Sequence, residues 1–219
     1  MTEALEVHTE HIRRLRGTAD STRQSLADTD RARERALRLS REMIRHSADS
    51  IRAIHRGEFD GASKLIESAS SLVQESRILL SEHPEVYFTG YVQDALKEYV
   101  EANAVLALIE NRPLPTADEL QVGAAAYLGG LSDTVGELRR FILDRLRRDD
   151  FSRCEQTLEL MDEIYTILVT MDFPDAVTRG LRRSTDMVRG ILERTRGDLT
   201  VALRQQRLEA LLSERGDVG

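Results

Sequence analysis

The sequence has few of the residues that cross-link a small protein or interrupt its helices. Its 219 residues contain one cysteine, four prolines, no tryptophan, and only 5% aromatic residues. Cys154 alone cannot form an intramolecular disulfide, which excludes the disulfide-rich secreted scaffolds. Pro84, Pro113, Pro115 and Pro174 fall between segments with helical hydrophobic periodicity, a pattern typical of an all-helical chain. With 41% hydrophobic residues, such a chain can bury a core without cross-links.

Long apolar runs and an excess of basic residues are also missing. No run approaches the roughly 18 apolar residues that span a membrane. Residues 1–30 are too charged for a signal peptide, so we expect a cytoplasmic protein that does not contact membranes. The net charge of -7 argues against a generally basic nucleic-acid binder, but it does not say where the charges of each sign lie.

Hydrophobic periodicity predicts an all-α fold of about seven helices joined by short loops. Leu37, Ile44 and Ile51 recur at a seven-residue spacing, and the following Gly57 is typical of a helix C-cap. Thr116 and Glu119 form a capping box, the clearest local signal of a helix start. The predicted helices cover approximately residues 29–55, 59–80, 91–110, 116–148, 149–171, 176–196 and 198–212.

The hydrophobic pattern also predicts how the chain divides. In residues 1–30 the apolar side chains of Leu5, Ile12 and Leu15 are too sparse to build a core, so this part is expected to be a polar N-terminal extension, helical or frayed. Residues 31–215 are expected to form one helical bundle domain.

Two pairs of acidic residues are the main candidates for chemistry. Glu98 and Glu101, three residues apart, share a face of one predicted helix, and Asp133 and Glu137, four apart, share a face of another. If the helices pack together, the pairs could face each other and bind a divalent metal ion. Such pairs also occur on ordinary solvated helices in a chain that is 32% charged.

Basic residues follow one predicted helix in rows. They are almost all arginine, because the chain has only two lysines, Lys64 and Lys97. Such rows can form a track for phosphate groups or can pair with acidic residues of neighbouring helices, and the sequence leaves both interpretations open. The candidate nucleic-acid-binding residues are Arg38, Arg41, Arg45, Arg52, His55 and Arg56.

Three motifs in chain order resemble the translin family. They are LSRE at residues 39–42, followed by the His55–Arg56 pair, then KEYVEA at 97–102 and YLGGLSDTVGEL at 127–138. The second and third are similar to the segments that carry the acidic residues of the family's catalytic branch, translin-associated factor X (TRAX). The set of four acidic residues is complete here, as it is in that branch.

The resemblance implies a translin-like helical bundle that assembles into a hollow homo-oligomer of eight subunits. It further implies a Mg²⁺-dependent endoribonuclease that cleaves single-stranded RNA inside the hollow, with single-stranded DNA as a second candidate ligand. Carried over by motif, the catalytic and metal-binding residues are Glu98, Glu101, Asp133 and Glu137.

Four carboxylates with no histidine or cysteine expected nearby form an all-oxygen site, which favours Mg²⁺, or alternatively Mn²⁺, over Zn²⁺. A cation held there would activate water for attack on phosphorus, and hydrolysis would leave a 5′-phosphate and a 3′-hydroxyl. Two alternatives remain at this point: a nucleic-acid-binding protein that does not cleave, and a helical scaffold that binds no nucleic acid.

Overall fold

The computed structural model describes the backbone of residues 2–216 and the side chains of residues 5–213. The all-α prediction is confirmed, and no strand occurs in residues 2–216. None of the helices in this range combines the length and the apolar character needed to cross a membrane. The six long helices are α1 (Thr2–His55), α2 (Phe59–Leu79), α4 (Gly90–Glu110), α6 (Ala124–Leu146), α7 (Cys154–Thr170) and α9 (Leu181–Gly216); the single-turn helices are α3 (Pro84–Tyr87), α5 (Ala117–Leu120) and α8 (Asp175–Thr178).

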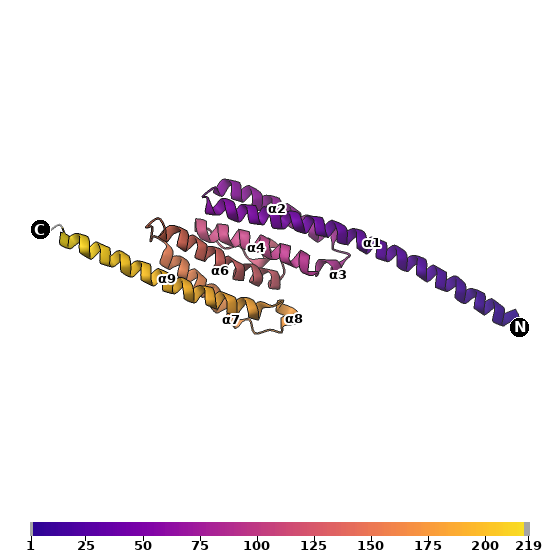
Figure 1. Ribbon diagram of the computed structural model, residues 1–219. Coiled ribbons are helices and arrows are strands. Elements are labelled where there is room, and N and C mark those ends of the chain that lie inside the picture. The colour runs from indigo at the N-terminus through magenta and orange to yellow at the C-terminus, as the bar shows by residue number, and fades with distance from the viewer. Residues whose placement is uncertain (1, 217–219) are drawn as a thin grey trace.

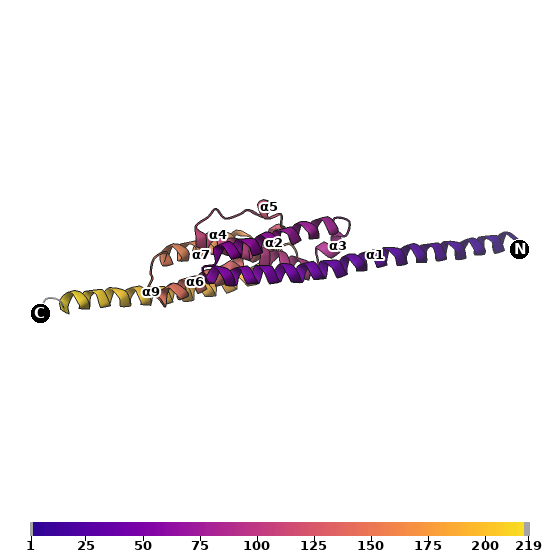
Figure 2. The same ribbon diagram turned by 90° about the horizontal axis from the view of Figure 1, so that it is seen from above.

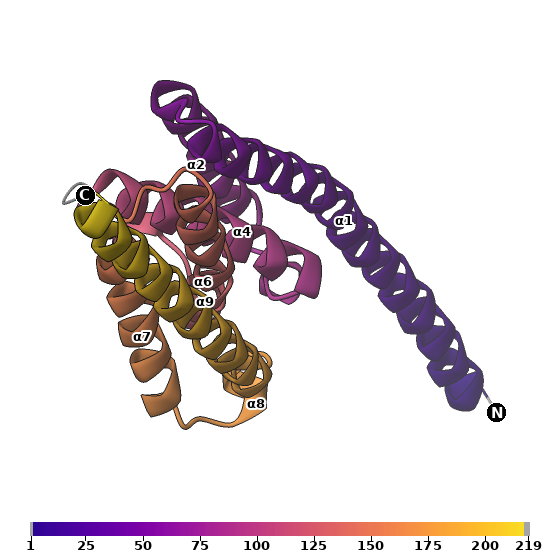
Figure 3. The ribbon, with the colours of Figure 1, turned by 60° about the vertical axis from the view of Figure 1, so that its left-hand side comes forward.

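The long helices pack side by side, and the ends of α1 and α9 project beyond them in opposite directions (Figure 1). Helix α1 packs against α2 and α4, and α4 lies between α1 and α6. Helix α6 in turn packs against α7 and α9, which also contact each other (Figure 3). The core between them includes Met43, Leu96, Val100, Leu138 and Met161, all fully buried. Helices α4 and α6 therefore form the centre of the bundle.

Helix α1 begins at Thr2, much earlier than the predicted start near residue 29. Its N-terminal part extends away from the bundle (Figure 2), and Leu5, Leu15 and Leu26 are exposed. Gly17 does not interrupt it, because one glycine costs a helix only about 1 kcal/mol relative to alanine. Ion pairs one turn apart support the exposed helix. They join Glu10 to Arg13 and Arg14, Asp20 to Arg23, and Asp28 to Arg31.

The C-terminal segment also differs from the prediction of two helices separated at Gly197. The structure has one helix, α9, across this position, preceded by the short α8. A Cβ at Gly197 would meet no atom within 4 Å, so the glycine is neither a turn nor a packing contact. The break lies instead at Arg179 and Gly180, whose φ angles are 53° and 85°.

The predicted capping box is present, but the helix that it starts is short. Thr116 Oγ1 accepts a hydrogen bond from the backbone N–H of Glu119, and the Glu119 carboxylate accepts one from the backbone N–H of Thr116. Helix α5 ends at Leu120 because Gln121 is left-handed, with a φ of 57°, and α6 begins after Gly123. The prediction of one helix over residues 116–148 was therefore wrong.

A glycine allows α4 and α6 to approach closely. A Cβ added to Gly130 would lie 2.6 Å from Val100 Cβ and 2.7 Å from the carbonyl oxygen of Lys97. Such contacts are too short for any other residue to fit without a shift of the helices. Gly130 therefore sets the separation of α4 and α6 next to the candidate acidic residues.

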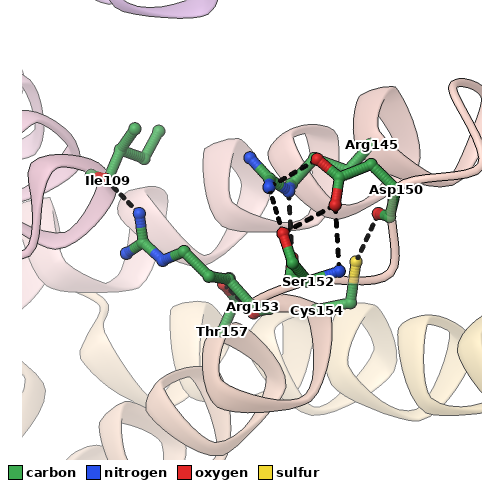
Figure 4. A network of polar contacts seen from close by, with 7 residues as sticks. All are labelled: Ile109, Arg145, Asp150, Ser152, Arg153, Cys154 and Thr157. Atoms are coloured by element: carbon green, nitrogen blue, oxygen red, sulfur yellow. Dashed lines mark hydrogen bonds and ion pairs between the residues drawn. The ribbon is translucent and has the colours of Figure 1, made fainter.

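The turn from α6 to α7 holds the C-terminal ends of α4 and α6 together (Figure 4). Arg145 forms an ion pair with Asp150 and donates hydrogen bonds to Ser152. Arg153 donates to the carbonyl oxygens of Ile109 and Leu108, at 2.5 and 2.9 Å. These carbonyls belong to the last turn of α4 and lack partners within the helix, so Arg153 satisfies them.

Candidate metal centre

Three of the four predicted acidic residues converge between α4 and α6. Glu98 and Glu101 lie one turn apart on α4, and Asp133 lies on the facing side of α6, one turn after Gly130. One carboxylate oxygen from each falls within 4.8 Å of the other two. Glu101 is buried, with 8% of its surface exposed, whereas Glu98 and Asp133 are partly buried. Asp94, one turn earlier on α4, is exposed and lies outside this cluster.

The cluster carries negative charge that the protein only partly compensates. Burial, together with the charges of Glu98 and Asp133, raises the pKa of Glu101 to about 8. Burial also raises the pKa of Glu98, against the opposing effect of Lys97. These shifts mean that the ionised form of the cluster is destabilised unless a cation is close to it.

Lys97 supplies part of the missing positive charge. Its Nζ lies 2.6 Å from Asp133 Oδ2, within the group of carboxylates. Burial acts to lower the pKa of Lys97, but the hydrogen bond to Asp133 and the charge of that carboxylate raise it further, so the pKa lies above its usual value. Lys97 is the first residue of the KEYVEA motif, but nothing in the sequence pattern indicates this ion pair.

Glu137 lies near the cluster but is held by another residue. Its Oε2 is 2.5 Å from Nε2 of His55, whose side chain is only 5% exposed. The hydrogen bond from His55 lowers the pKa of Glu137 below its usual value, although burial opposes this. The expectation that no histidine lies near the acidic residues was therefore wrong. The end of α1 brings His55 onto α6, a contact across 82 residues that helical periodicity cannot reveal.

Five of the six basic candidates lie along one side of α1, and Arg56 directly follows its last residue. At 100° per residue they fall within about 100° of arc, with His55 at the edge next to α6. Arg52 pairs with Asp49 and Arg56 with Glu58, so local ion pairs occupy both. Within residues 5–213 no ion pair involves the exposed Arg38, Arg41 or Arg45. This stretch of α1 therefore presents three unpaired arginines, and His55 faces Glu137 instead of an open surface.

Comparison with known structures then identifies the fold. The crystal structure of AfC3PO superposes with a TM-score of 0.79 at 37% sequence identity, covering 86% of this chain and 98% of that one. C3PO is the complex of translin and TRAX. The chain belongs to the translin family. AfC3PO in complex with duplex RNA gives a TM-score of 0.80 with the same coverage of this chain and 97% of that one.

Two further proteins are similar to this chain. The apo structure of NeC3PO matches with a TM-score of 0.75 at 24% identity, covering 84% of this chain and 96% of that one, and shows the fold alone. The uncharacterized protein MJ0175 of Methanocaldococcus jannaschii is 33% identical over 186 residues, which cover 84% of this chain and 82% of that protein. No family model matches the sequence. The translin-family prediction is thus confirmed by the two AfC3PO structures.

Proposed function

We propose that this translin-family protein is a Mg²⁺-dependent endoribonuclease of the TRAX-like branch, which cleaves single-stranded RNA inside a hollow homo-octamer. The observation that carries the proposal is the convergence of Glu98, Glu101 and Asp133, with ligand atoms within 4.8 Å of one another, around a carboxyl group with a pKa of about 8. Buried carboxylates that lack enough compensating charge suit a divalent cation, and an all-oxygen donor set suits Mg²⁺ or Mn²⁺.

The residues around the cluster have separate roles in this proposal. Glu98, Glu101 and Asp133 hold the cation, and Glu137 is the fourth acidic group, held beside them by His55. Lys97 keeps Asp133 in place through its ion pair. A divalent cation at this position would supply a Lewis acid that polarises the phosphate and makes water a better nucleophile. Attack of water on phosphorus with cleavage of the P–O3′ bond would leave a 5′-phosphate and a 3′-hydroxyl.

The exposed arginines of α1 supply a surface for the strand. Arg38, Arg41 and Arg45 lie on the side of α1 that ends at His55, next to the acidic cluster, and Arg52 and Arg56 would have to exchange an acidic partner for phosphate. Guanidinium groups form forked contacts with phosphate, which makes arginine suited to such a track. AfC3PO has been solved with duplex RNA, which supports RNA binding by this relative.

Cleavage assays with labelled single-stranded RNA test the proposal. With Mg²⁺ we expect products with 5′-phosphate and 3′-hydroxyl ends, and EDTA should abolish them. Glu101→Gln and Asp133→Asn should each reduce cleavage at least about 100-fold, because each removes a cation ligand. Asp94→Asn is the matched control, since Asp94 is exposed on the same helix and should not affect the rate. Absence of cleavage, or full activity in both variants, would contradict the proposal.

One feature favours a second candidate, a translin-type protein that binds single-stranded RNA or DNA without cutting it. The ion pair from Lys97 to Asp133 and the hydrogen bond between His55 and Glu137 show that the chain's own side chains already occupy two of the acidic residues. In that case RNA affinity should fall steeply with salt and remain the same in EDTA, and the RNA should stay intact. The cleavage assay therefore distinguishes the two functions, because only the endoribonuclease shortens the labelled RNA.

A further inference from the structure

A small cavity lies at the end of the bundle next to the acidic cluster. Its volume is about 190 Å³, and it forms where α1, α4 and α6 end and α2 begins. Drug-sized ligands occupy pockets of about 300–1,000 Å³, so this one suits a single planar group. Among the residues that line it are His55, Arg56, Phe59, Phe141, Asp144 and Arg148.

The cavity and the acidic cluster are adjacent along α6. His55 lines the cavity and also holds Glu137. Arg140 lies 3.7 Å from Glu137 and 3.9 Å from Asp144, so it connects the two regions. Seven residues separate Glu137 from Asp144, which is roughly 10 Å of helix rise. A strand that crosses the acidic cluster would therefore bring a nearby nucleotide to the cavity.

The charges around the cavity suit a base better than a phosphate. The C-terminal ends of α1 and α6 meet there, and their carbonyl groups carry partial negative charge that repels an anion, whereas the last carbonyl groups of α4 accept hydrogen bonds from Arg153. Guanidinium groups offset this charge and provide hydrogen-bond donors, while Phe59 and Phe141 provide apolar walls. A neutral ring with polar edges fits this combination, as in the recognition of unstacked RNA bases.

The polar groups point to one base in particular. Arg148 is exposed and has no ion-pair partner in the described part of the chain, so its donors are available to a ligand. Asp144 has 37% of its side chain exposed and offers only acceptors, and its neighbours Arg140 and Arg147 lie at 3.9 and 3.6 Å, beyond hydrogen-bond distance. Guanine matches this pair best, because its adjacent N1–H and N2–H groups can donate to both oxygens of one carboxylate while O6 accepts from a guanidinium, whereas adenine has a single donor group at that edge.

We propose that this cavity binds one guanine base of the RNA strand, with Arg148 donating to its O6 atom and Asp144 accepting from its N–H groups. The proposal rests on the proposed function, because it requires that a strand cross the acidic cluster. It adds a preference for guanine close to the cleaved bond, which the acidic cluster itself cannot provide.

Binding of RNA decamers, measured by fluorescence anisotropy in EDTA, tests this proposal. Glu101→Gln is introduced throughout so that the strands stay intact. The probes are an all-adenine decamer and the same decamer with one central guanine. We expect the guanine strand to bind about 10-fold more tightly, the size of one good base contact. Asp144→Asn and Arg148→Ala should each remove this preference.

Arg41→Ala is the matched control. Arg41 is an exposed arginine of the proposed strand surface that does not line the cavity, so this variant should bind both strands more weakly and keep the preference. Equal affinities for the two decamers, or a preference that survives both Asp144→Asn and Arg148→Ala in folded protein, would overturn the guanine site alone. If neither strand binds at all, the proposed function fails with it.

Discussion

At the scale of single residues, Glu101 combines burial with an ionisable group. Its pKa of about 8 in the folded protein compares with an ordinary value of 4.5, which the unfolded chain should show. At pH values between 4.5 and about 8, the Glu101 carboxyl group therefore binds a proton when the protein folds. The contribution of Glu101 to the free energy of unfolding is therefore present below about pH 4.5 and is lost as the pH rises towards 8.

Urea unfolding in EDTA at several pH values between 5 and 8 measures this effect. We expect the free energy of unfolding to fall with pH by at most about 1.4 kcal/mol per unit from this group, and to fall less in Glu101→Gln. At pH 8, added Mg²⁺ should restore stability to the wild-type protein, because a ligand of the folded state stabilises it. Asp94→Asn should behave as wild type. Identical slopes in wild type and Glu101→Gln would show that Glu101 titrates normally.

The sequence predicted individual residues of the centre but not their partners. Glu98, Glu101 and Asp133 could be found because their spacing places them on helix faces and because their motifs resemble a known family. The ion pair of Lys97 with Asp133 and the contact of His55 with Glu137 depend on how α4, α6 and the end of α1 pack. No local pattern records such contacts, so only the structure shows that His55 adjoins the acidic residues.

At the scale of helices, the packing of α4 on α6 depends on Gly130. A methyl group there would collide with Val100 and with the Lys97 carbonyl oxygen, so the helices would have to separate. We expect Gly130→Ala to lower the free energy of unfolding by about 1–3 kcal/mol, the usual cost of overpacking. Urea denaturation measures this change.

Gly136, two turns later on α6, provides the control. A Cβ there would meet no atom within 4 Å, and the helix would gain a residue with a better helix propensity. Gly136→Ala should therefore raise the free energy of unfolding by up to about 1 kcal/mol. Equal effects of the two substitutions would mean that helix propensity, not the contact with α4, determines the role of Gly130.

The sequence could predict those helix boundaries that depend on local backbone geometry. Gly57 and the Thr116–Glu119 capping box mark ends that the structure has, because both act through local backbone geometry. Gly17 and Gly197 resemble breaks but lie within continuous helices, since a single glycine is tolerated where neighbouring residues favour the helix. The left-handed Gln121, which separates α5 from α6, is an ordinary residue in sequence and gives no such signal.

At the scale of the whole molecule, the first half of α1 makes little contact with the bundle. From Leu5 to Ala27 all side chains except the partly covered Glu10 are exposed, and the first buried residue is Ala32. Deleting residues 2–24 should therefore change the free energy of unfolding, measured in urea, by no more than about 0.5 kcal/mol. A larger loss that grows with protein concentration would show that this segment packs against a second copy. The division into an extension at 1–30 and a domain at 31–215 remains a prediction.

The absence of a side chain at Gly130 also affects which ion the proposed metal centre would prefer. Oxygen ligands surround Mg²⁺ at about 2.0–2.1 Å and Ca²⁺ at about 2.3–2.6 Å. Glu98 and Glu101 move with α4, and Asp133 moves with α6, so under the proposed function the spacing of these helices would limit the size of the ion that the three carboxylates bind. A larger residue at position 130 would widen that space and shift the preference towards Ca²⁺. Gly130 would then contribute to the selectivity for Mg²⁺ over Ca²⁺.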